Sequence, residues 1–123
     1  KTIYFIPPVK GVVTNGYNPM VYHYGIDLVA APNEVVLSIA KGTIILSNWT
    51  LETGYTLSIQ HDNNFISVYK HNSKLLKRQG DRVDAGEAIA IIGNSGELTT
   101  GPHLHFELWQ NGHSVDPAKF INF

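Results

Sequence analysis

The alternation of apolar and polar residues is clearest in residues 55–60, where the odd positions are apolar and the even positions are polar. A period of two is typical of a half-buried antiparallel strand. The polar triplet 62–64 then predicts a hairpin turn into a second strand over 65–69. Further short runs rich in β-branched and aromatic residues, each bounded by turn residues, predict strands over 35–39, 43–49, 88–92 and 104–109.

The first twenty residues carry no comparable pattern. Prolines and glycines interrupt them at Pro7, Pro8, Gly11, Gly16 and Pro19. This composition predicts loop and edge structure, and nowhere in the chain does a 3.6-residue apolar period persist over three turns. We therefore expect an all-β fold of mostly antiparallel sheets in a compact, sandwich-like arrangement with little helix. We also expect a single domain over 1–123, with 1–15 as a lead-in and the recognisable motifs within 16–123.

Composition narrows the classes of function. The 123 residues are 43% hydrophobic and 15% charged, which suits one packed core and argues against disorder. The formal net charge of -1 provides no attraction to nucleic acid. No apolar run reaches the ~18 residues that span a bilayer. Cysteine is absent, so disulfides and thiol chemistry are excluded, and a transition-metal site would have to use imidazole and carboxylate groups.

Two pairs of potential metal ligands stand out among the polar residues. His23 and Asp27 are four residues apart, and His103 and His105 are two apart, so the alternation of a strand would place each pair on one face. Gly25 is expected to leave open space between the first two. Same-face neighbours on a strand are separated by ~7 Å, so we expect one of the two later histidines to bind metal while the other stands beside it. Two histidines and one carboxylate suit catalytic zinc, and they also suit ferrous iron.

These motifs resemble those of a known family. His23 to Asp27 followed by His103 to Glu107 is similar to the H-x-x-x-D and H-x-H signatures of the lysostaphin-like, or LytM-like, zinc metalloendopeptidases, which are peptidoglycan hydrolases. The likeness extends from about residue 16 to the end of the chain. Segments that agree with the family in order and spacing are 31–32, 41–44, 69–72, 80–86 and 93–96.

The resemblance implies a lysostaphin-type peptidase fold and a role for each motif residue. His23, Asp27 and His105 would bind one zinc ion per chain, and His71 and His103 would be the two active-site histidines that do not bind it. Tyr17 matches a tyrosine that some members place in the cleft, where it would contact substrate. The implied activity is zinc-dependent hydrolysis of peptide cross-links or stem peptides of bacterial peptidoglycan, in which a zinc-activated water attacks with the help of the two histidines.

The same resemblance implies a location in the bacterial cell envelope, outside the cytoplasmic membrane, in the periplasm or secreted. Peptidoglycan peptide would be the partner, and an N-terminal anchoring or inhibitory segment would precede residue 1. Loops that would select the substrate are expected at 48–54 and 94–101. Which peptidoglycan bond is cleaved, and which of His71 and His103 is the general base, are both open.

Two other functions compete with this interpretation. Some lysostaphin-like domains are catalytically silent and activate a cell-wall amidase by binding it, although here every ligand position is filled. A biotinyl or lipoyl carrier domain is the second alternative because residues 80–90 resemble its half-motif, but the modifiable lysine is missing. Among the remaining candidates, His61 and His113 are expected to do no chemistry, and Glu107 is left outside the site.

Overall fold

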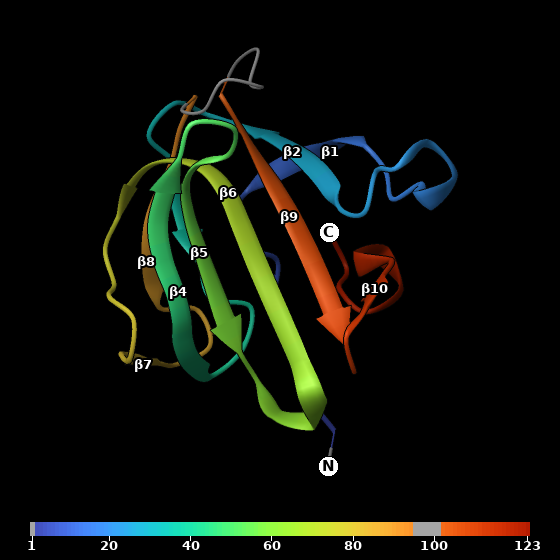
Figure 1. Cartoon of the computed structure of the whole chain (residues 1–123). Helices are drawn as coiled ribbons and strands as arrows, with labels where there is room; N and C mark the ends of the chain where they lie inside the picture. The colour runs from blue at the N-terminus through green and yellow to red at the C-terminus, as the bar shows by residue number, and fades with distance from the viewer. Residues whose placement is uncertain (1, 95–101) are drawn as a thin grey trace.

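The computed structural model describes residues 2–94 and 102–123, and its regular secondary structure consists mainly of strands (Figure 1). Within those ranges helical geometry is limited to three short 3-10 turns, η1 (Pro19–Val21), η2 (Asp62–Asn64) and η3 (Pro117–Lys119), and no helix could cross a membrane. The predicted all-β fold is therefore confirmed. The strands are β1 (Gly11–Asn15), β2 (Ile26–Ala30), β3 (Val35–Leu37), β4 (Gly42–Thr50), β5 (Gly54–Gln60), β6 (Phe65–Leu75), β7 (Arg82–Val83), β8 (Ala88–Ile92), β9 (His103–Gln110) and β10 (His113–Val115).

All strand pairs are antiparallel, and the main path across the sheet runs β1-β2-β9-β6-β5-β4-β7. The long strand β6 is its centre. The first part of β6 pairs with β5 and β9, and its last residues, from Asn72 to Leu75, pair with β8, which in turn pairs with β3. Figure 1 shows β4, β5, β6 and β9 side by side across the molecule. β6 therefore joins the main path of the sheet to the pair formed by β8 and β3.

The core lies between these strands and consists of side chains from alternate positions. In β9, Leu104, Phe106 and Leu108 are fully buried, as alternation predicts. In β5, Leu57 and Ile59 are buried as well, but Thr56 and Ser58 on the opposite face are also buried, so the expectation of a half-buried strand is wrong here. The other fully buried large side chains are Ile26, Leu28, Ile39, Ile44, Tyr69, Ile89 and Ile92. The face of β9 that carries His105 is consequently turned away from the core.

The N-terminal segment contains an edge strand. The sequence predicts loop and edge structure in this lead-in, and residues 11–15 form β1, which pairs with β2 at the end of the sheet. Every residue of β1 is exposed, which explains why its sequence lacks the alternation of a half-buried strand. Earlier in the chain Val9 is buried, and Ile3 and Phe5 pack against the core. This segment is therefore part of the packed structure.

Candidate metal centre

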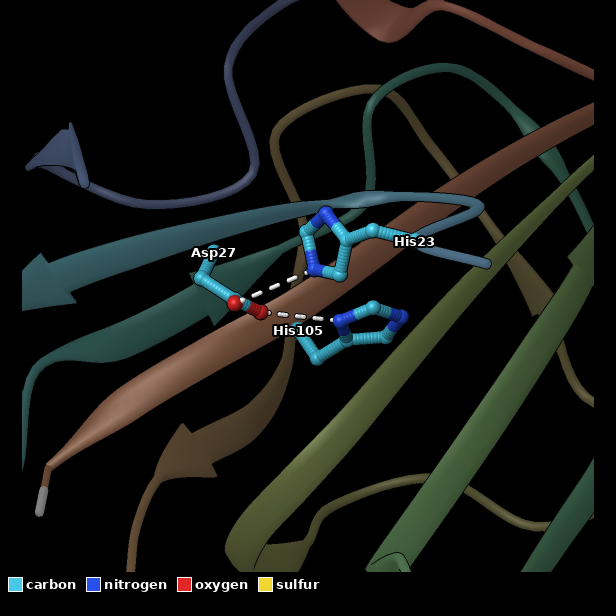
Figure 2. A group of neighbouring side chains, drawn as sticks. All are labelled: His23, Asp27 and His105. Atoms are coloured by element: carbon cyan, nitrogen blue, oxygen red, sulfur yellow. Dashed lines mark hydrogen bonds and ion pairs between the residues drawn. The ribbon is translucent and has the colours of Figure 1, made fainter. Parts of the chain in front are cut away.

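Three of the predicted site residues come together where β2 lies against β9 (Figure 2). His23 precedes β2, Asp27 is its second residue, and His105 is the third residue of β9. One ligand atom from each lies within 4.8 Å of the others. The carboxylate of Asp27 is shared, with Oδ2 3.2 Å from Nε2 of His23 and Oδ1 2.8 Å from Nδ1 of His105. The register of β2 on β9 places Asp27 directly opposite His105.

His23 is held by backbone structure outside the strand. It forms a bridge with Asn18, in which each backbone N–H donates to the other residue's carbonyl at 2.9 and 3.0 Å. Nδ1 of its ring lies 2.7 Å from the carbonyl oxygen of Gly16. Because a carbonyl only accepts, Nδ1 carries the proton and Nε2 presents its lone pair toward Asp27. The expectation that His23 and Asp27 share a strand is wrong, since β2 begins at Ile26.

A second carboxylate lies on the other side of His105. Oε2 of Glu107 is 2.8 Å from Nε2 of His105 and 3.1 Å from Nζ of Lys70, and Oε1 accepts a hydrogen bond of 2.9 Å from Nε1 of Trp109. Glu107 is 8% exposed. Glu107 stands outside the site that the sequence predicts, although its position two residues after His105 on the same face of the strand is a signal for it.

The electrostatics of the cluster favour positive charge at His105. Burial would raise the pKa of Asp27, but hydrogen bonding and attraction to His105 and His23 lower it below its ordinary value. Burial would also raise the pKa of Glu107, yet His105, Lys70 and Trp109 together bring it to about 2. For His105 burial lowers the pKa, and the two carboxylates outweigh it and raise the value. A metal cation would satisfy the same demand for positive charge.

His71 and His103 lie next to the cluster. Their ring centroids are 5.1 Å apart, and the ring of His71 is 6.3 Å from that of His105. Leu57 pairs with Tyr69 while Tyr55 pairs with Asn72, so β6 holds one residue more than β5 over this interval and forms a β-bulge. His71 lies in the bulge with φ 68°, in the left-handed region. The bulge interrupts the alternation of β6 and turns the ring toward the other histidines.

Gly25 has a different role from the predicted one. We expected the missing side chain to leave open space for a cation between His23 and Asp27. A Cβ on Gly25 would instead lie 2.5 Å from the carbonyl oxygen of Phe106, 2.8 Å from Cγ of Glu107 and 3.0 Å from Nε2 of His105. The glycine therefore allows β9 and the bonded pair of Glu107 and His105 to approach the chain closely.

The other candidates lie in separate places. The hydroxyl of Tyr17 is 2.7 Å from Oγ of Ser114, and the ring packs against the core, so its contact with substrate stays a prediction. His113 is exposed on β10. His61, which we expected to be explained by a turn, is 6% exposed, with Nδ1 2.8 Å from the carbonyl of Lys41 and Nε2 2.7 Å from Oγ of Ser67. The expected loop at 94–101 lies outside the described residues except for Asn94.

The donor set fits zinc. Two imidazole nitrogens and a carboxylate oxygen converge from three different points of the chain, and all three residues are partly exposed, so a further ligand could approach from solvent. Each histidine has its other ring nitrogen engaged, with a backbone carbonyl for His23 and a carboxylate for His105. Such outer hydrogen bonds are typical of histidines that bind metal.

Comparisons with known proteins identify relatives of this chain. The sequence model of peptidase family M23 matches residues 21–117. The murein hydrolase activator NlpD of Escherichia coli is 32% identical over 98 residues, which are 79% of this chain and 25% of NlpD. A crystal structure of a zinc-containing peptidase from Vibrio cholerae superposes with a TM-score of 0.85 at 32% identity, covering 93% of this chain and 39% of that one. Lysostaphin from Staphylococcus simulans superposes with a TM-score of 0.74 at 31% identity, covering 90% and 48%.

The curated relatives are much longer than the region of similarity. The chain spans 25% of the length of NlpD and between 23% and 32% of the length of other curated relatives. The similarity therefore concerns one part of each relative.

Proposed function

Because the chain belongs to peptidase family M23, we propose that it is a zinc-dependent endopeptidase that hydrolyses peptide cross-links or stem peptides of bacterial peptidoglycan. The observation that carries the proposal is the convergence of His23, Asp27 and His105 within 4.8 Å, with the rings of His71 and His103 beside them. The similarity to a zinc-containing peptidase and to lysostaphin supports it. This function implies a location outside the cytoplasmic membrane, where peptidoglycan lies.

The site residues divide into metal ligands and catalytic histidines in this proposal. Nε2 of His23, the carboxylate of Asp27 and Nδ1 of His105 would hold the ion. When bound, zinc supplies Lewis-acid chemistry, lowering the pKa of a coordinated water to about 7 and polarising a peptide carbonyl. His71 and His103 take up the proton of the attacking water, return it to the leaving amine, or donate a hydrogen bond to the developing oxyanion. Their rings lie close enough together for both to face one peptide bond.

The test is release of soluble fragments from defined peptidoglycan, measured by mass spectrometry, together with the zinc content of the purified chain. We expect about one zinc per chain and release that stops when a chelator is added and returns with zinc. The fragment masses would identify the bond. His105→Ala should lose both properties, and His113→Ala, at an exposed histidine outside the cluster, serves as the matched control. Zinc-loaded wild-type chain that releases nothing would contradict the proposal.

A second function is favoured by one comparison. NlpD, which is 32% identical over 98 residues, is named as a murein hydrolase activator. In that case the chain would bind a cell-wall amidase and stimulate it without cutting peptide bonds itself. One assay distinguishes the two functions: the chain is mixed with an amidase and peptidoglycan. Stimulated release of stem peptides that persists in His71→Ala and His103→Ala would support activation, whereas release by the chain alone supports the peptidase.

A further inference from the structure

The carboxylate of Glu107, which lies outside the metal cluster, accepts hydrogen bonds from three donors. Both of its oxygens are engaged, Oε2 by His105 and Lys70 and Oε1 by Trp109, at distances between 2.8 and 3.1 Å. The carboxylate is also nearly excluded from solvent. A buried carboxylate held at both oxygens has little freedom to rotate, so its position relative to the imidazole of His105 is fixed.

That fixed position determines which nitrogen of His105 is free. A carboxylate only accepts, so Nε2 of His105 carries the proton of the 2.8 Å hydrogen bond. In a neutral imidazole the lone pair is then on Nδ1, and Nδ1 is the atom that faces Asp27 at 2.8 Å (Figure 2). Without Glu107, no carboxylate at Nε2 would fix the tautomer of the His105 ring or its rotation.

We propose that Glu107 is a positioning residue that holds the His105 ring with its Nδ1 lone pair directed at the metal position. The inference rests on the proposed zinc site and adds a residue to it. Gly25 contributes room for this arrangement, because a side chain there would collide with Cγ of Glu107 and with Nε2 of His105. Lys70 and Trp109 act one step further out, since each donates a hydrogen bond to the carboxylate of Glu107.

The test measures zinc binding and the tautomer of His105 rather than cleavage. Zinc affinity is measured by competition with a chromophoric chelator in wild type, Glu107→Ala and Glu107→Gln. Loss of such an outer partner typically costs about 10–100-fold in metal affinity, and we expect a loss in that range for Glu107→Ala. Glu107→Gln should recover part of it because its amide oxygen still accepts from Nε2. Glu52→Ala is the matched control, since it removes an exposed glutamate outside the site and should keep the zinc affinity of wild type.

Nitrogen NMR of the His105 ring supplies the second readout. In wild type loaded with zinc we expect Nε2 to carry the proton, and in Glu107→Ala we expect that signal to broaden or shift. Circular dichroism checks that each variant is folded. Wild-type zinc affinity and an unchanged ring signal in folded Glu107→Ala would overturn the inference, as would a wild-type chain that binds no zinc. Zinc binding without cleavage would contradict the peptidase alone and leave the role of Glu107 standing.

Discussion

Asp27 and His105 are separated by 78 positions in the chain and lie directly opposite each other in the pairing of β2 with β9, with Oδ1 and Nδ1 2.8 Å apart. Opposite residues of an antiparallel pair have their Cβ atoms within ~5.5 Å, so this register alone brings the two side chains together. The carboxylate reaches His23 with its other oxygen. Asp27 is thus the residue that joins the two histidines into one site.

Replacing Asp27 should therefore empty the site without unfolding the sheet. In Asp27→Asn the side chain keeps its size but loses its charge, and we expect the purified protein to lose its zinc during dialysis against a chelator that wild type withstands. Atomic emission spectroscopy measures the metal. Asn15→Ala is the comparison, because the Asn15 amide donates to Oδ2 of Asp27 at 3.2 Å and lies 3.5 Å from Nε2 of His23 without belonging to the ligand set, and the variant should keep most of its zinc. Zinc retained equally in Asp27→Asn and wild type would remove Asp27 from the ligand set.

Substitution of His71 or His103 should separate catalysis from metal binding. Each replacement by Ala is expected to leave about one zinc per chain and to reduce kcat by about 10²–10⁴-fold, the usual contribution of a general acid or base. Fragment release from peptidoglycan gives the rate, and metal analysis gives the zinc content. If His71→Ala or His103→Ala lost as much zinc as His23→Ala, the replaced histidine would have to be counted among the metal ligands.

The positions of strands could be predicted from the sequence where one face of the strand is buried. The arrangement of the metal ligands in space could not be predicted in this way. The alternation in β9 follows from Leu104, Phe106 and Leu108, which pack in the core. The partner of His105 depends on a register set by tertiary packing, which no local pattern contains. The bounds of the exposed edge strand β1 could not be predicted for a related reason, because none of its side chains is buried in the core.

Two residues of the site departed from what residue type alone suggests. Glutamate on the polar face of a strand is ordinarily solvated, and burial of Glu107 depends on Lys70 and Trp109 being its neighbours, which only the fold determines. A positive φ at His71 could not be expected, because this region is unfavourable for residues with a Cβ. Both departures lie beside the metal cluster, where local rules are commonly broken for function.

The left-handed backbone of His71 allows a test that distinguishes backbone strain from the catalytic role of the imidazole. With φ 68° this residue lies in a region that costs L-residues about 1–2 kcal/mol and costs glycine almost nothing. His71→Gly should accordingly be more stable to urea than His71→Ala by about 1 kcal/mol, although both lack the imidazole and should be equally inactive. Equal unfolding midpoints for the two variants would show that the backbone at residue 71 relaxes once the ring is removed.

Gly25 offers a test of the close approach between β9 and the chain before β2. In Gly25→Ala the new Cβ would lie 2.5 Å from the carbonyl oxygen of Phe106, which belongs to the backbone and cannot turn away. We expect a loss of about 1–3 kcal/mol of stability in urea unfolding, in the range of overpacked sites, together with weaker zinc binding. Gly16→Ala is the matched control because a Cβ there would meet nothing within 4 Å. Equal stability of the two variants would contradict the tight packing at Gly25.

The buried imidazole of His61 should make stability depend on pH from a point outside the metal site. Burial lowers its pKa below the ordinary value of 6.5, and the Lys41 carbonyl and the charge of Asp62 offset only part of that effect. The unfolded chain therefore binds a proton more readily than the folded one. It follows that the contribution of His61 to stability is complete above pH 6.5 and is lost as pH falls through 6.5 toward the lower pKa of the folded state.

Urea unfolding of wild type and His61→Gln, well above and well below pH 6.5, measures this contribution. Other groups, including His105, titrate in both proteins, so the difference between the two pH profiles isolates His61. Wild type should lose more stability on acidification than His61→Gln does. His113→Gln is the matched control, since it replaces a histidine whose side chain is exposed. Parallel profiles for wild type and His61→Gln would mean that the hydrogen bonds to Lys41 and Ser67 accommodate the charged ring as well as the neutral one.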